Sequence, residues 1–249
     1  MESLPSVTAL GAAVRRAISA APKELARHGS PLIDRLVATG DPDRLHALEQ
    51  YRQLARTYDM RTSAGAPYRR RTVERLAPAP GEVILDVGCG TGLNFGAVEE
   101  GIGPDGRLIG IDLCPEMLER ARARVENCGW QNVELVQAAA DEAQISTLAD
   151  AVLLCGIHDV MRSPTALANV LRHLRPGGRV VAGGARWAPW WRPGSVALNL
   201  STLAMNRGYV TTVEGFDRPW SHLADLVPDL QIEDVYFGGG YIAWGVRGG

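Results

Sequence analysis

The segment ILDVGCGTG, residues 84–92, places three glycines directly after a short apolar run that contains an acidic residue, Asp86. Glycine has no side chain, so at Gly88, Gly90 and Gly92 the backbone can approach a ligand closely and can adopt positive φ angles. A glycine-rich turn that follows the first strand of an α/β sheet and opens a helix forms a ligand-binding site at the carboxyl edge of the sheet. The segment therefore predicts a binding loop for a small ligand.

The spacing of the glycines narrows the class of ligand. A dinucleotide-binding fingerprint, G-x-G-x-x-G, counted from Gly88 would need a glycine where the chain has Leu93. A phosphate-binding P-loop would need a lysine, and this loop contains none. The spacing thus disfavours loops that bind pyrophosphate, and with them an NAD-dependent oxidoreductase.

A second acidic residue, Asp112, ends the apolar run in LIGIDLCPEML. It follows the glycine loop at about the distance where α/β proteins place the acid that binds a ribose. A carboxylate at this position can accept hydrogen bonds from both ribose hydroxyls. We therefore expect a ligand that has a ribose and no tightly held phosphate.

These residues need a sheet to position them, and short apolar runs alternate with helical patterns after residue 78. The predicted strands are residues 83–87, 107–112, 133–137, 150–156 and 178–184, and the predicted helices lie near 93–101, 115–128, 142–148 and 164–175. Pro115 and Pro164 suit the first position of a helix, and Ser163 is a natural helix N-cap. The alternation predicts a parallel sheet covered on both faces, which is an α/β, Rossmann-like three-layer sandwich.

The two ends of the chain depart from this alternation. Residues 1–78 are predicted to form a helical N-terminal extension or lid, interrupted at prolines and glycines. Residues 79–249 form the second domain, with a long irregular insert at 185–228. Its last segment, 231–248, is expected to form two antiparallel strands at the sheet edge.

The N-terminal extension contains one clear amphipathic pattern, in DPDRLHALEQYRQLARTYDMRT. A helical period places five residues on one side: Leu45, Leu48, Leu54, Ala55 and Tyr58. We expect this side to cover the edge of a core or to form a lid.

Three motifs in order, VILDVGCGTG, GIDLCPEML and LRPGGRVV, resemble those of the class I S-adenosylmethionine-dependent methyltransferases. The resemblance covers roughly residues 51–184, and the terminal strand pair agrees with the edge of the family's sheet. It implies a seven-stranded, mostly parallel sheet with an antiparallel last strand. It also implies S-adenosylmethionine as methyl donor, bound across the ends of the first two strands and converted to S-adenosylhomocysteine.

The resemblance implies donor-binding roles residue by residue. Gly88, Gly90 and Gly92 would line the methionine and ribose side of the donor. Asp86 would orient the loop or contact the donor's amino group, and Asp112 would hold the ribose.

The adenine side of the site departs from the family's pattern. Leu113 and Met117 would pack near the adenine. The family often has an aspartate after the third strand that contacts the adenine amine, but this chain has Ala139 there. Asp141 or Glu142 is expected to take its place through a small shift.

Two residues are candidates at the methyl-transfer end. YRQLARTYDMRT resembles the family's short helix whose aromatic residue closes over the donor, which suggests Tyr58, or else a tyrosine that only packs a helix. LLCGIHDVMRSP follows the fourth strand, beside the expected methyl group. His158 in this loop is the catalytic candidate, contacting the acceptor or acting as general base, unless it is a structural histidine.

The insert at 185–228 coincides with the position of the family's acceptor cap. It holds four of the six tryptophans, namely Trp187, Trp190, Trp191 and Trp220, and more arginines than acids. This composition predicts a lid over a small apolar or lipid-like acceptor, resting on a membrane surface, or alternatively a helical subdomain with tryptophans in its core. GTGLNF and GWQNVEL are similar to lipid-modifying members, although a polyketide or terpenoid acceptor fits equally.

Composition and motifs disfavour several other classes. The net charge of -2, with no basic tail, and the loop CGIHDV argue against a nucleic-acid methyltransferase. The four cysteines show no metal-ligand spacing and no disulfide pattern, which predicts no metal site and a cytoplasmic location. We expect no transmembrane segment, and a homodimer is compatible with the sequence. A remaining alternative of another class binds the donor without methylating, as a cyclase-like or regulatory protein.

Overall fold

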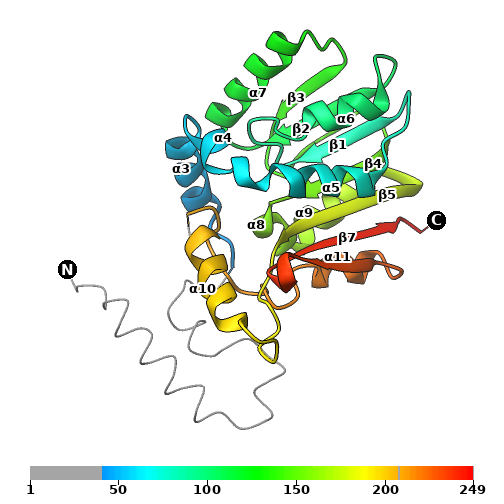
Figure 1. Ribbon diagram of the computed structural model, residues 1–249. Helices are drawn as coiled ribbons and strands as arrows, with labels where there is room; N and C mark the ends of the chain where they lie inside the picture. Colours follow the sequence, from blue (N-terminus) through cyan, green and yellow to red (C-terminus); the bar gives the residue numbers. More distant parts are fainter. Residues whose placement is uncertain (1–40, 207, 249) are drawn as a thin grey trace.

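The computed structural model describes residues 41–206 and 208–248, and these contain a seven-stranded sheet in the order β3-β2-β1-β4-β5-β7-β6 (Figure 1). The strands are β1 (Val83–Val87), β2 (Arg107–Asp112), β3 (Val133–Gln137), β4 (Ala149–Cys155), β5 (Leu174–Ala185), β6 (Gln231–Val235) and β7 (Gly240–Val246). Pairing is parallel from β3 to β5, and β7 runs antiparallel to both of its neighbours. The predicted Rossmann-like architecture and its antiparallel last strand are confirmed.

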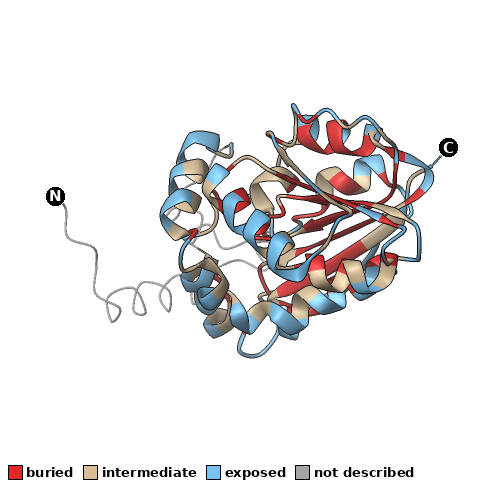
Figure 2. Cartoon of the chain, turned by 90° about the horizontal axis from the view of Figure 1, so that it is seen from above, coloured by how far each residue is buried: buried red, intermediate tan, exposed pale blue. Residues whose placement is uncertain are grey.

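Helices cover both faces of the sheet because its strands are apolar on both sides. One layer consists of α5 (Ala66–Leu76), α6 (Phe95–Ile102) and α7 (Pro115–Cys128), and the other of α8 (His158–Met161), α9 (Pro164–Arg172) and α11 (Ser221–Leu226). Successive residues of β1 point to opposite faces, so Ile84 packs under the first layer and Leu85 under the second. Figure 2 shows the buried strands between helices whose outer surfaces are exposed.

Local signals in the sequence set the helix ends. Ser163 caps α9 by accepting a hydrogen bond from the backbone N–H of Ala166, and a proline follows it, as predicted. α7 also begins at a proline and ends at Gly129 in the left-handed conformation. These boundaries place the amino ends of both helices at the carboxyl edge of the sheet.

The predicted helix at 142–148 is wrong, because residues 141–148 form turns and irregular backbone. Asn169 from α9 donates its side-chain amide to the carbonyl oxygens of Ala140 and Ala143, at 2.8 and 3.0 Å. Tertiary hydrogen bonds therefore hold this short segment instead of a helical ladder. β5 is longer than predicted, since it begins at Leu174 and continues through a register shift at Gly177 with φ of 74°.

The described part of the N-terminal extension is helical, as predicted, whereas residues 1–40 lie outside the described residues. Its elements are α3 (Arg44–Leu54), α4 (Tyr58–Arg61), the short 3-10 helix η2 (Ser63–Gly65) and α5. The prediction that one helix carries a single amphipathic stripe is only partly correct, because α3 ends before Tyr58 and the side chain of Leu45 is 78% exposed. Leu48, Ala55 and Tyr58 pack together against the start of α7.

The insert contains α10 (Ser195–Asn206) and α11, and the turn between β6 and β7 contains the 3-10 helix η3 (Tyr236–Gly238). α10 and α3 lie at the same end of the molecule (Figure 1). No helix among the described residues combines the length and the apolar character needed to cross a bilayer.

Candidate functional site

The glycine loop between β1 and α6 needs glycine at each of its three positions, because φ is 64° at Gly88, 56° at Gly90 and 77° at Gly92. A Cβ on Gly88 would collide with Ile157, and one on Gly92 would lie 2.7 Å from the Phe95 ring. A Cβ on Gly90 would meet no heavy atom of the described residues within 4 Å. Neighbouring side chains therefore leave no room for a Cβ at Gly88 or Gly92, whereas the space beside Gly90 is open.

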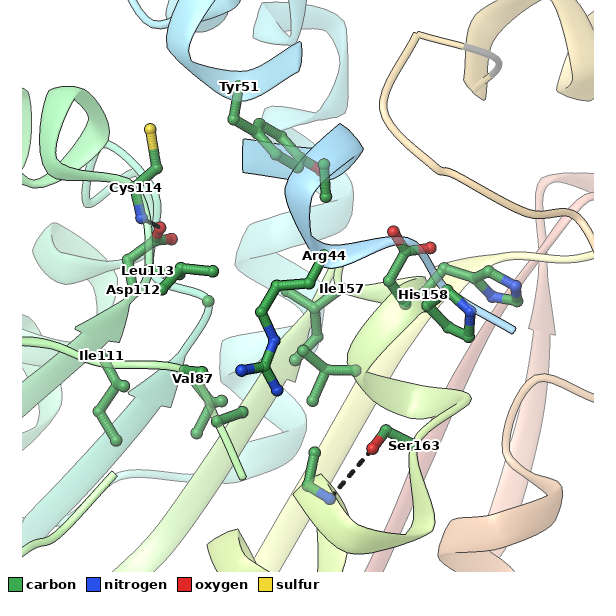
Figure 3. Close-up of a pocket in the computed structure, with 18 of the residues that line it drawn as sticks. Arg44, Tyr51, Val87, Ile111, Asp112, Leu113, Cys114, Ile157, His158 and Ser163 are labelled. Atoms are coloured by element: carbon green, nitrogen blue, oxygen red, sulfur yellow. Dashed lines mark hydrogen bonds between the residues drawn. The ribbon is translucent and has the colours of Figure 1, made fainter. Parts of the chain in front are cut away.

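A cavity of about 450 Å³ lies at the carboxyl edge of the sheet, where β1, β2 and β4 end (Figure 3). Eight of the predicted site residues line it: Tyr58, Gly88, Gly90, Asp112, Leu113, Met117, Asp141 and His158. Asp86 and Gly92 do not line it. One cavity thus joins most of the residues that the motifs single out.

The Asp112 carboxylate ties the loop after β2 to the glycine loop. Its two oxygens accept hydrogen bonds from the backbone N–H groups of Cys114 and Gly90, both at 2.8 Å. Burial raises the pKa of the Asp112 carboxyl, and these N–H donors oppose that rise. The carboxylate is thereby held at the cavity wall in a fixed orientation.

Asp86 lies behind the glycine loop, fully buried, and not in the cavity wall. The side-chain amide of Asn94, the N-cap residue of α6, donates to its carboxylate at 3.2 Å. Burial raises the pKa of the Asp86 carboxyl to about 7. Of the two roles considered for Asp86, this position favours orienting the loop.

The wall formed by the ends of β2 and β3 is mainly apolar. Leu113, Met117 and Ala139 line it, and the side chain at 139 brings no polar group. Asp141 lies at its rim, where the Arg44 guanidinium of α3 contacts its carboxylate at 2.5 Å and that of Glu142 at 2.7 Å. This ion pair anchors the start of α3 beside the cavity.

Three tyrosines from distant parts of the sequence meet at the cavity. Tyr58 of α4 has its ring 6.2 Å from that of Tyr51 and 5.9 Å from that of Tyr209. The Tyr51 hydroxyl donates to the carbonyl oxygen of Tyr209 at 2.8 Å. Burial raises the pKa of Tyr58 to about 12, so its hydroxyl stays protonated at neutral pH.

Tyr51 and Tyr209, which both line the cavity, were not among the site residues predicted from the sequence. Tyr51 lies seven residues before Tyr58, and this helical spacing could have suggested it. No local signal identifies Tyr209, because it lies 158 residues from its partner Tyr51.

His158 lies at the start of α8 and lines the cavity on the side of β4. Its Nε2 is 3.0 Å from the carbonyl oxygen of Glu214, and its ring meets the edge of Phe216 with centroids 4.3 Å apart. Burial lowers the pKa of His158 to about 4, so the ring is neutral and Nε2–H donates to that carbonyl. Nδ1 is then a buried acceptor without a partner among the described residues.

The insert combines a small core with a contribution to the cavity wall. Trp187 packs with Val213 and Phe216 in this small core, whereas Trp220 is buried in the main core, beside Tyr241 of β7. Trp191, in contrast, is 73% exposed. Tyr209 is the residue by which the insert reaches the cavity.

Comparison with known proteins identifies the domain. Residues 84–178 match a family model described as a methyltransferase domain. Demethylmenaquinone methyltransferase from Lactococcus lactis is 31% identical over 146 residues, which are 57% of this chain and 53% of the relative. Aklanonic acid methyltransferase from a Streptomyces species is 30% identical over 136 residues, which are 53% of this chain and 61% of the relative. The chain spans about half the length of the curated relatives that it matches.

A solved structure shares the fold. The N-methyltransferase NodS from Bradyrhizobium japonicum, in complex with S-adenosyl-L-homocysteine, superposes with a TM-score of 0.53 at 18% identity, covering 73% of this chain and 86% of that one. The strand order, the positions of the motifs and the match to the family model all point to the same kind of domain. Residues 84–178 therefore form a methyltransferase domain, and the strand order and motifs around it are those of the class I, S-adenosylmethionine-dependent methyltransferases.

Proposed function

We propose that this protein transfers the methyl group of S-adenosylmethionine to a small apolar or lipid-like acceptor. The observation that carries the proposal is the single cavity that joins the glycine loop and Asp112 to His158. S-adenosylmethionine supplies a methyl group already activated on a sulfonium. The protein's task is then to align the two reactants and to exclude water.

The residues of the cavity fit this donor. The open side of Gly90 leaves room for a ligand against the backbone, and the fixed carboxylate of Asp112 suits two ribose hydroxyls. Leu113 and Met117 offer an apolar wall for the adenine, with Asp141 at its rim. Asp141 already holds Arg44, so we assign the principal polar contact to Asp112.

The three tyrosines form the cover of the reaction centre. Tyr51, Tyr58 and Tyr209 come from α3, α4 and the insert, and their contacts close one wall of the cavity. A closed aromatic wall excludes water and strengthens electrostatic interactions inside. We therefore assign the N-terminal helices and the insert to the lid and the acceptor cap.

His158 is the proposed contact to the acceptor. Its Nε2–H is held by the Glu214 carbonyl, which leaves Nδ1, buried and without a partner among the described residues, as the ring nitrogen that an acceptor hydroxyl or amine would have to reach. The lowered pKa makes the ring a weak base, which suits positioning of the acceptor through a hydrogen bond better than removal of its proton. Adjacent Asp159 instead accepts a hydrogen bond from Thr211 at 2.8 Å.

The apolar acceptor is supported by the cavity and by the relatives. Val87, Ile111 and Ile157 line the cavity beside the glycine loop. The relatives include proteins named demethylmenaquinone methyltransferase, aklanonic acid methyltransferase and nocamycin O-methyltransferase. An arsenite methyltransferase is also similar, so the class shared by the names is a small molecule.

The test incubates the full chain with S-adenosylmethionine and panels of quinols, phenols and apolar amines, and measures added methyl groups by mass spectrometry. We expect a methylated product from at least one apolar panel, and an approximately tenfold or greater loss of turnover in His158→Leu, on the scale of losing one hydrogen bond that positions the acceptor. The donor affinity of this variant should equal that of the wild type.

Two results would contradict the proposal. Tight donor binding without any methylated product would favour a donor-binding protein of another function. Unchanged turnover in His158→Leu would remove His158 from the acceptor site.

A further inference from the structure

Aromatic side chains that point to solvent gather where the insert meets the turn between β6 and β7. Trp191 is 73% exposed, Tyr236 54% and Phe237 91%. The two segments touch, because Arg192 donates to the carbonyl oxygen of Phe237 at 3.4 Å. We call Trp191, Tyr236, Phe237 and Met205 the aromatic surface.

The backbone holds Phe237 outward in a conformation that is unusual for its type. φ is 51° at Tyr236 and 57° at Phe237. Both values lie in the left-handed region of backbone conformation, which residues other than glycine and asparagine rarely adopt. The Tyr236 ring packs at 5.7 Å from that of Tyr68 on α5, which helps to fix the turn. A strained backbone conformation persists only where the surrounding structure enforces it. In this turn the enforced conformation leaves the Phe237 side chain exposed.

α10 adds to this surface because three of its polar side chains face inward, while Ser201 is exposed beside Met205. Ser195, Asn199 and Thr202 are its buried residues, and Asn199 bonds both the N–H and the carbonyl of Ala188, at 2.7 and 3.0 Å. Leu198 lies beside Gly239 of the turn, and Met205, seven residues later on the same flank, is 65% exposed. The outward side of this uncharged helix is therefore apolar or weakly polar.

Arginines outnumber acids around the aromatic surface. Arg71 and Arg75 of α5 both pair with Glu233, and Arg186 and Arg192 of the insert both pair with Asp234. Beside the turn, Arg186 and Arg192 share the single acid Asp234, which leaves this group with a net charge of plus one, and Arg71 and Arg75 share Glu233 farther along β6. An anionic surface would complement the excess.

We propose that the aromatic surface binds the anionic face of a lipid bilayer. Exposed tryptophan and phenylalanine prefer the boundary between headgroups and acyl chains, and arginines add attraction to anionic headgroups. The surface lies at the same edge of the sheet as the cavity, since Gly240 after the turn pairs with Ala185 at the carboxyl end of β5. This binding is independent of methyl transfer.

The test measures co-flotation of the full chain with vesicles of phosphatidylcholine alone and of equal parts phosphatidylcholine and phosphatidylglycerol. We expect binding to the anionic vesicles, weakened by salt, and an approximately tenfold or greater loss in the double variant Trp191→Ser, Phe237→Asn. Asparagine tolerates the left-handed conformation, so the turn should persist. Leu148→Ser is the matched control, because Leu148 is 53% exposed but precedes β4 at the opposite edge of the sheet.

Several outcomes would overturn the proposal. They are absence of binding to both vesicle types, equal binding of the double variant, equal binding to vesicles of phosphatidylcholine alone, and an equal loss in Leu148→Ser. Size-exclusion chromatography tests the main alternative, in which a second copy of this chain covers the aromatic surface. A dimer of the wild type that the double variant dissociates would assign the surface to a second copy of this chain.

Discussion

Asp86 is a predicted donor-site residue that supports the glycine loop and does not line the cavity. Its carboxyl is buried on β1 with the Asn94 amide as hydrogen-bond donor, and burial raises its pKa from 3.8 to about 7. In the unfolded chain the same carboxyl ionises at its ordinary pKa. The stabilisation that follows from the raised pKa is therefore complete below pH 3.8 and is lost as the pH rises through about 7.

Asp86→Asn should remove this pH dependence. Between about pH 4.5 and about pH 8, the free energy of unfolding of the wild type should fall by up to a few kcal/mol more than that of the variant, at about 1.4 kcal/mol per pKa unit. Urea unfolding at both pH values measures it, with exposed Asp105→Asn as the control. Equal losses in wild type and Asp86→Asn would show that Asp86 does not titrate in this way.

Individual site residues were predictable where one short motif contains them. The glycines and Asp112 follow strand ends, so their place at the carboxyl edge follows from the topology of a parallel sheet. Asp86 and Gly92 belong to the same motif but support the loop from behind, which the spacing alone does not distinguish. Tyr209 reaches the cavity only through the tertiary path of the insert, and no local pattern predicts that path.

At the scale of elements, a three-residue clamp holds α4 on the glycine loop. The Asp59 carboxylate accepts hydrogen bonds from Thr91 Oγ1 and from Arg124 of α7, at 2.5 and 2.7 Å. Arg124 also donates to the carbonyl of Thr91 at 2.9 Å. Because Tyr58 precedes Asp59, the clamp fixes the position of Tyr58 relative to the loop.

Arg124→Gln should loosen α4 and weaken donor binding. The pair is partly exposed, so we expect a loss of about 0.5–1 kcal/mol in donor affinity and a comparable coupling to Asp59→Asn in a double-mutant cycle. Exposed Arg120→Gln on the same helix is the control and should leave donor binding unchanged. Additive effects of the two substitutions would disprove the clamp.

Elements were predictable where burial or caps dominate. The central strands are continuous apolar runs, and α7 and α9 begin at prolines, so both kinds of element were found close to their observed bounds. The prediction of a helix at 142–148 was wrong because Asn169 of α9 donates a hydrogen bond to a carbonyl oxygen of this segment. The length of β5 was underestimated because the register shift interrupts the regular strand pattern in its first half.

At the scale of the whole molecule, the N-terminal helices and the insert meet over the cavity. The backbone N–H of Asp43 donates to the Thr211 hydroxyl at 3.0 Å across 168 residues of sequence, and Thr211 in turn bonds Asp159 after β4. The sequence predicts both segments as covers but contains no pattern that pairs them. The N-terminal helices and the insert meet because both lie at the carboxyl edge of the sheet.

The measurement that tests the central claim most directly is a calorimetric titration of the full chain with S-adenosylmethionine and S-adenosylhomocysteine. We predict micromolar binding of both by the wild type and by the control Asp105→Ala, and binding weaker by about 1–3 kcal/mol in Asp112→Ala, the scale of losing hydrogen bonds to a charged group. Absence of binding by folded wild type, or unchanged affinity in Asp112→Ala, would contradict the assignment of this cavity to the methyl donor.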